Sequence, residues 1–244
     1  MECIDFDGLN EGEIPNQLYT VAGSGPIGVN RVNPNNPLPN SAMVFNSAMP
    51  TGGDPDLGTP HSDFGGPGIG AGGAAGAPNE NNTPLGNLMI VSADLDTTDP
   101  DDLNDEGELH FDFTAIGPVT VHKMTIVDVE GKEGPPTVRF YNAAGALFKT
   151  ITLTTVGDNG VAQVNLGPVT GVSKMQLHFE GSGAVGDLCL ETTAMPAARY
   201  NASVESVLFE VNGSLLQRKA PPPGSSYKVE TPTAPGTQLL VTTI

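Results

Sequence analysis

The sequence contains no tryptophan, and phenylalanine and tyrosine together make up 5 % of its 244 residues. No apolar run comes close to the ~18 residues that a membrane-spanning helix needs. The N-terminus, MECIDFDG, has neither the basic nor the apolar segment of a secretory signal. These absences predict no membrane insertion and no signal peptide in this chain. They also weigh against an aromatic-lined sugar cleft, because the chain has only 4 tyrosines.

Basic residues are scarce and unevenly placed. The chain has 10 Lys and Arg against 28 Asp and Glu, and residues 1–122 hold eighteen acids with Arg31 as their single base. A field this negative repels nucleic acid and anionic membranes, so we expect neither as a partner. The first half of the chain then needs either dispersed, solvated carboxylates or bound cations.

Helix-forming stretches are also lacking, because 31 glycines and 22 prolines interrupt every helical window. Short β-branched runs alternate with period two instead, which predicts an all-β sandwich without a helix longer than a turn or two. The expected strands are Cys3–Asp7, Ile27–Val32, Ala42–Phe45, Asn87–Ser92, Glu108–Phe113, Val119–Val129, Thr137–Asn142, Leu147–Thr154, Val161–Asn165, Ser173–Phe179 and Asp187–Leu190.

A long segment between residues 46 and 86 shows almost no strand pattern, and ten of residues 52–76 are glycine. Loops of this length inside a compact domain are usually functional or disordered. We expect an ordered loop that is held by something other than apolar packing.

Residues 203–244 predict a second, smaller unit after a linker at 192–202. Val204–Val211 forms one strand, Asn212-Gly213 a two-residue turn, and Leu215–Lys219 the returning strand. About four strands are too few to close a sandwich, and open edges pair with other chains. The tail is therefore a candidate for self-association into fibres by strand addition; the alternatives are packing on the first unit of its own chain or a frayed end. The candidate residues are Leu239, Leu240, Val241 and Ile244.

The two cysteines lie at opposite ends of the first unit, Cys3 in its first strand and Cys189 in its last. If these strands pair antiparallel with residue numbers that add to 192, Cys3 faces Cys189 and Asp5 faces Asp187. This register predicts a disulfide. The alternative is two buried, unpaired cysteines.

Aspartates concentrate in the Gly-rich loops and at the strands that carry the cysteines. Opposed carboxylates repel one another unless a cation lies between them, and Ca²⁺ takes about six to eight oxygen ligands. The pattern predicts bound calcium; the alternative is a solvated acidic surface in which aspartate serves as a turn former. The candidate ligands are Asp5, Asp7, Asp54, Asp56, Asp94, Asp96, Asp101, Asp102 and Asp187.

The sequence shows no clear catalytic motif. His61, His110, His122 and His178 are scattered, with no metal-binding spacing, and Gly23-Ser24-Gly25 is no nucleophile elbow. Paired carboxylates are too numerous for spacing to nominate a glycosidase pair. We expect no enzyme.

Five segments within residues 2–191 are distinctive: IDFDGL with Gly12, MVFNSAMPTGGDPDLGTP, GGPGIGAGG, LMIVSADLD and GSGAVGDLCLE. They resemble a family of bacterial extracellular jelly-roll modules that recur in large surface proteins. The resemblance implies a secreted, non-catalytic β-sandwich. In similar jelly-roll carbohydrate-binding modules, acids on the first and last strands hold a structural calcium, which implies Asp5 or Asp7 together with Asp187.

The tail carries SVLFEVNGS, APPPGSSY and PGTQLLVTTI, which resemble the second half of a bacterial immunoglobulin-like module. The chain as a whole therefore predicts a calcium-stabilised jelly-roll at 1–191, a linker, and a partial immunoglobulin-like β unit at 203–244. The expected function is a structural or adhesive module of a bacterial surface, with copies of itself or other surface proteins as partners. The alternative is a calcium-dependent carbohydrate-binding module.

Overall fold

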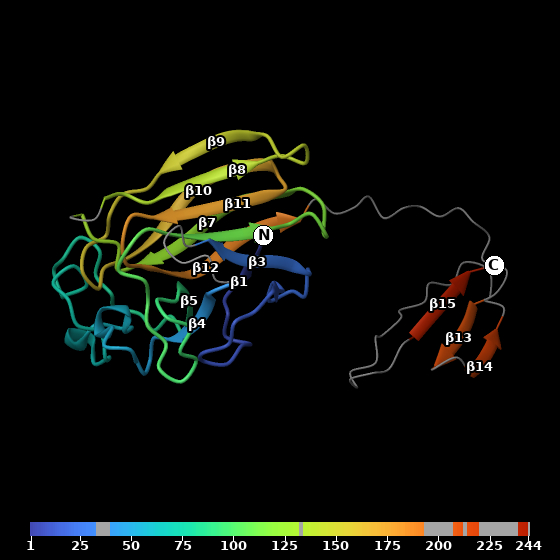
Figure 1. Cartoon of the computed structure of the whole chain (residues 1–244), viewed down its shortest axis with the longest axis horizontal. Coiled ribbons are helices and arrows are strands. Elements are labelled where there is room, and N and C mark those ends of the chain that lie inside the picture. Colours follow the sequence, from blue (N-terminus) through green and yellow to red (C-terminus); the bar gives the residue numbers. More distant parts are fainter. Residues whose placement is uncertain (33–39, 132–133, 193–206, 212–213, 220–238, 244) are drawn as a thin grey trace. The chain divides into compact units, whose positions relative to one another are not determined.

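The computed structural model describes residues 1–32, 40–131, 134–192, 207–211, 214–219 and 239–243 (Figure 1). The chain divides into two compact units, Met1–Ala194 and Met195–Ile244, with the boundary inside the segment predicted to be a linker. Apart from two short 3-10 turns, η1 (Pro55–Leu57) and η2 (Ser62–Phe64), the regular elements of the described residues are strands. None of the helices found there is long and apolar enough to cross a membrane.

The first unit consists of two antiparallel sheets of six strands each (Figure 1). Sheet 1 contains β1 (Glu2–Ile4), β4 (Ala42–Asn46), β5 (Asn87–Val91), β7 (Val119–Val127), β10 (Val161–Val172) and β12 (Ala184–Thr192). Sheet 2 contains β2 (Gln17–Leu18), β3 (Ile27–Val32), β6 (Gly107–Asp112), β8 (Thr137–Tyr141), β9 (Leu147–Thr152) and β11 (Lys174–Phe179). The predicted all-β sandwich is confirmed.

The strand order is that of a jelly roll. From β5 to β12 the chain alternates between the sheets, with one step within sheet 2, and produces the orders β5-β12-β7-β10 and β6-β11-β8-β9. Eight strands interleaved in this way form two Greek keys. Strand β4 extends sheet 1 beyond β5, β1 pairs with β12, and β3 with β2 extends sheet 2 beyond β6.

Alternating side chains fill the space between the sheets. On β6, Leu109 and Phe111 are fully buried, whereas the alternate residues His110 and Asp112 are half-buried on the outer face of sheet 2. The same alternation holds along β11. Period-two patterning therefore divides sheet 2 into an apolar inner face and a polar outer face.

Strands β4 and β5 have no solvated face. Ala42 and Val44 belong to the core between the sheets, while Met43 and Phe45 pack on the opposite side with Leu57 from the long loop. This second apolar layer covers sheet 1 from outside. The loop is ordered, as expected, and Leu57 shows that it also contributes apolar packing.

The second unit contains a three-stranded antiparallel sheet, β14 (Ser214–Lys219), β13 (Val207–Val211) and β15 (Leu239–Thr243), in that order. Of the residues predicted for self-association, Leu239, Leu240 and Val241 lie on β15, which pairs with β13. Ile244 lies outside the described residues, as do most of the linker and residues 220–238. The immunoglobulin-like character and self-association of this unit stay predictions.

Candidate functional site

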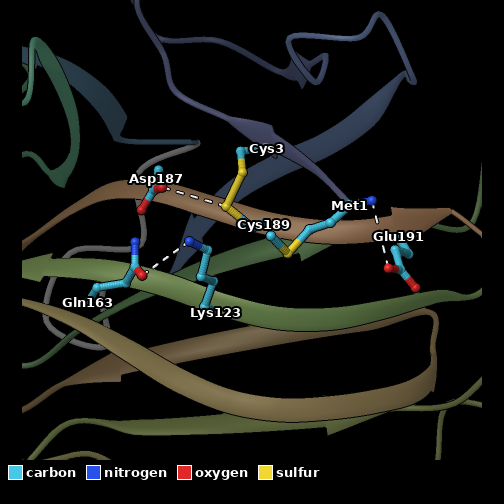
Figure 2. Close-up of a disulfide and its surroundings, with 7 residues drawn as sticks. All are labelled: Met1, Cys3, Lys123, Gln163, Asp187, Cys189 and Glu191. Carbon is cyan, nitrogen blue, oxygen red and sulfur yellow. Dashed lines mark hydrogen bonds and ion pairs between the residues drawn. A yellow bond between two sulfur atoms is a disulfide. The ribbon is translucent and has the colours of Figure 1, made fainter.

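The disulfide joins the first and last strands of the jelly roll, between Cys3 on β1 and Cys189 on β12 (Figure 2). The two strands pair in the predicted register, with Cys3 opposite Cys189 and Ile4 opposite Leu188. Ile4 and Leu188 are buried in the core. The predicted disulfide is therefore confirmed, together with the reason for it: the register places both cysteines on the same face of sheet 1.

The carboxylates near the disulfide do not form a common site. An oxygen of Asp187 lies close to the sulfurs, with Oδ2 3.6 Å from Cys189 Sγ (Figure 2). Asp7 Oδ1 instead accepts the backbone N–H of Asn87 at 2.8 Å, and Asp5 Oδ1 accepts that of Asp7 at 3.3 Å. The group of donor atoms around Asp187 contains Cys3 and Cys189 and neither Asp5 nor Asp7. The pairing of Asp5 or Asp7 with Asp187 that the resemblance implies stays a prediction.

A different group of carboxylates converges where the long loop meets the ends of β7 and β10. Oxygens of Asp56, Asp128 and Asp158 all lie within 4.8 Å of one another. Next to them, Asp54 Oδ2 accepts the backbone N–H of Asp102 at 2.9 Å. We call Asp54, Asp56, Asp102, Asp128 and Asp158 the acidic cluster; among the described residues no Lys, Arg or His forms an ion pair with any of them.

Burial without a counter-charge changes the acid strength of this cluster. Desolvation, reinforced by the charge of Asp56, raises the pKa of Asp128 to about 8. Desolvation likewise raises the pKa of Asp54 to about 6, and it raises the pKa of Asp102, which is 4 % exposed, well above its usual range. The cluster therefore favours either protons or a bound cation at neutral pH.

Asn159 fixes the cluster in place. Its backbone N–H donates to Asp128 Oδ1 at 2.7 Å, while its side-chain amide donates to the carbonyl oxygens of Asp56 and Gly58 at 2.6 and 2.8 Å. Asn81 from the long loop donates to Gly58 O and to Asn159 Oδ1. These polar bonds attach η1, with its acids, to the end of β7.

The acids that follow β5 have another role. Asp94 Oδ1 accepts the N–H of Asp96, and Asp96 Oδ1 accepts the N–H and hydroxyl of Thr98, which are turn-forming bonds. Asp101 lies in the same loop but resembles the acidic cluster more than the turn-forming acids. Its Oδ1 is buried without a hydrogen-bond partner among the described residues, and desolvation raises its pKa. The turn-forming interpretation therefore holds for Asp94 and Asp96, whereas calcium binding by the buried carboxylates stays a prediction.

The outer face of sheet 2 forms a second polar region. Cross-strand pairing places Asn30, His110, Gln176 and Arg139 in one row over β3, β6, β11 and β8. Glu108, in the next row, accepts from His110 Nε2 at 2.7 Å and from Arg139 Nη1 at 3.1 Å. The His110 hydrogen bond and the surrounding positive charges hold the pKa of Glu108 below its usual value.

A cavity of about 640 Å³ lies over this face. Its lining residues come from β3, β6, β11 and the adjoining segments, and include Gly28, Asn30, His110, Asp112, Lys174 and Gln176. Gly28 opens the floor, since a Cβ there would lie 3.2 Å from that of Asp112. Phe111, the one Phe, Tyr or Trp among the described residues of the lining, is buried in the core, so the ring that remains at this cavity is the partly exposed imidazole of His110.

Sequence reasoning did not identify Asp128, Asp158 or the residues of the cavity. Asp128 lies in the run TIVDVE, where one acid among β-branched residues was a usable signal. On β6 and β11 the alternating polar residues of HFD and KMQLH were visible, but only the strand pairing shows that they share one surface.

No protein-family model matches the chain, and no curated protein matches it. Among solved structures it is similar to the Streptococcus pneumoniae fucose-binding module SpX-3, with a TM-score of 0.27 and 11 % identity over 43 % of this chain and 69 % of that one. A likeness of this size carries no argument about a ligand.

Proposed function

We propose that the first unit is a non-catalytic extracellular module that attaches to carbohydrate through the outer face of sheet 2. The observation that carries this proposal is the cavity of about 640 Å³ on that face, within the range of ligand sites, which spans roughly 300–1,000 Å³. The disulfide is in keeping with an oxidising compartment outside the cell. Attachment to a glycan is also a form of the adhesive role predicted from the sequence.

The chemistry of the lining suits a polyhydroxylated ligand. Tyr141 Oη donates to Gln176 Oε1 at 2.7 Å, which orients the amide so that its nitrogen is the group left for a ligand. Asn16 and Asn30 also line the cavity, and within the described part of the chain their side chains form no hydrogen bonds. Amides both donate and accept, as sugar hydroxyls do. Binding here rests on hydrogen bonds rather than on stacking against a ring.

Binding to a panel of neutral and acidic oligosaccharides, measured by calorimetry, tests the proposal. Gln176→Ala should weaken the binding of a glycan about fivefold, the effect of losing one hydrogen bond of typical strength, about 1 kcal/mol. Gly28→Val, which fills the floor of the cavity, should weaken it further. Gln163→Ala, on β10 of sheet 1, is the matched control and should change nothing. Equal effects of Gln176→Ala and Gln163→Ala, or no binding to any glycan, would contradict the proposal.

We also propose that the acidic cluster holds Ca²⁺ and that the ion stabilises this unit. Support comes from the donor set, which is all oxygen, and from the absence of ion pairs to it among the described residues. Asp56, Asp128 and Asp158 would supply the carboxylates, and a divalent charge would offset their mutual repulsion.

Native mass spectrometry with and without chelator tests this second proposal. The unmodified protein should carry calcium that the double variant Asp56→Asn/Asp158→Asn loses. The matched control, Asp94→Asn/Asp96→Asn, makes the same change of charge in the turn-forming loop and should keep the ion. If the control loses the ion and the cluster variant keeps it, calcium binds in the 94–105 loop instead; if the unmodified protein carries none, the cluster is protonated rather than metal-bound.

A further inference from the structure

Arg31 is a buried cation that has no counter-ion within the part of the chain that the structure describes. Its side chain is 3 % exposed, and Nη1 donates to Ser41 Oγ at 2.6 Å. Among the described residues, Nε and Nη2 have no hydrogen-bond partner and no carboxylate forms an ion pair with the guanidinium. The adjoining segment, residues 33–39, contains no acidic residue. A buried charge of this kind is costly to the fold, and arginine keeps its charge at any physiological pH.

Arg31 is also part of the lining of the cavity on sheet 2, although it lies opposite the buried Leu109 of β6, so that its side chain extends from the inner face of this sheet. The described part of the first unit has five basic residues, Arg31, Lys123, Arg139, Lys149 and Lys174, and two of them, Arg31 and Lys174, line this cavity. Among the described residues of the lining the single carboxylate is Asp112, 3.1 Å from Lys174 Nζ. Lys174 and Asp112 balance one another on the outer face, and the guanidinium of Arg31, beneath the sheet, adds a positive charge that no described carboxylate pairs, in a protein whose formal net charge is −18.

The excess positive charge has a consequence for the ligand. A neutral glycan would leave the positive charge of Arg31 without a compensating negative charge. An anionic group in the cavity would supply one, and the low dielectric of the protein between the two groups would keep their attraction strong. Elsewhere the acidic surface repels anions, so an acidic ligand would be directed to this face. The amides of Asn30 and Gln176 remain available for hydroxyl groups.

We propose that the ligand of this cavity is an acidic oligosaccharide, one that carries the carboxylate of a uronic acid. The inference rests on the proposed carbohydrate-binding function and specifies its ligand class. Lys174, 54 % exposed at its side chain, contacts the carboxylate directly, and Arg31 stabilises it from beneath the floor of the cavity.

The test uses pairs of ligands that differ only in the carboxylate. Oligogalacturonate, oligomannuronate and hyaluronan oligomers are each compared by calorimetry with their carboxyl-reduced, neutral forms. At least one acidic oligosaccharide should bind, and its neutral form should bind about tenfold more weakly. Lys174→Gln should weaken the acidic ligand about threefold without affecting the neutral one, and Arg31→Met should reduce the preference between them. Lys149→Gln, on β9 outside the cavity, is the matched control and should leave both affinities unchanged.

The outcomes of this test distinguish the failure of the acidic-ligand proposal from the failure of carbohydrate binding itself. Binding of neutral glycans alone, or equal affinity for the two members of every pair, overturns the acidic ligand and leaves carbohydrate binding in place. Failure to bind any neutral or acidic glycan overturns both. The comparison of paired ligands on the unmodified protein decides the question, so the result does not depend on how well the Arg31→Met variant folds.

Discussion

At Asp128 the fold holds a carboxyl group under conditions that favour its proton. Burial raises its pKa from 3.8 to about 8, so without a cation the folded protein keeps a proton that the unfolded chain has already released. The stabilising contribution of this proton is complete below pH 4 and is lost as the pH rises toward 8. We therefore expect the melting temperature of chelated protein to fall between about pH 5 and 8.

Calcium should prevent this fall in the melting temperature, because the ionised carboxylates of the acidic cluster would then contact a divalent cation. Differential scanning calorimetry across this pH range, with chelator and with excess calcium, measures the effect. Asp128→Asn removes the titrating group and should flatten the profile of the chelated protein. A chelated protein that becomes more stable with rising pH would show that Asp128 is ionised in the fold without any cation.

The acidic cluster was only partly predictable from individual residues. Asp54, Asp56 and Asp102 stood out because they lie in acid-rich loop segments, where several carboxylates occur close together in the sequence. Asp128 was assigned to a strand that was expected to continue to Val129, whereas β7 ends at Val127 and Asp128 takes a φ of 61°. Local pattern cannot place such a residue next to Asp56, because that contact depends on how the long loop folds back.

At the level of elements, period-two alternation predicted most strands of the first unit to within a few residues. It failed for β2 (Gln17–Leu18), which is too short to show a period, and for β10, which continues past Asn165 to Val172 through irregular register. Strands β4 and β5 lack alternation because the long loop buries their second face. The partner that covers a face cannot be read from the strand itself.

The attachment of the long loop should depend on Asn159. Asn159→Ala removes the side-chain hydrogen bonds to Asp56 O and Gly58 O, although Gly58 O keeps the bond from Asn81. It also places alanine at a φ of 58°, in the left-handed region that alanine disfavours. We expect the free energy of unfolding to fall by roughly 2–4 kcal/mol, measured by urea titration. Calcium binding should weaken with it, since η1 carries the acids. Asn82→Ala, an exposed amide in the same loop, should cost less than about 0.5 kcal/mol; equal losses for both variants would refute this role.

At the level of the whole molecule, the second unit gives a direct test of the assembly prediction. The described sheet has β14 and β15 as its edges. If these edges pair with other copies, the full chain should sediment as oligomers in analytical ultracentrifugation, and deletion of residues 203–244 should leave a soluble monomer. A full chain that is monomeric at high concentration would refute assembly through the tail while leaving the carbohydrate proposal untouched.

The disulfide between the first and last strands also determines how the first unit carries mechanical load. Tension applied at the two ends of this unit enters at Cys3 and leaves at Cys189, so the covalent bond takes the force and the 186-residue span between the cysteines is bypassed. In optical tweezers, the oxidised unit should lengthen by only a few residues. After reduction, unfolding should release roughly 60 nm of chain, at about 3.4 Å for each residue. A unit built in this way is an inextensible link, and the strands between the two cysteines stay folded however hard the chain is pulled.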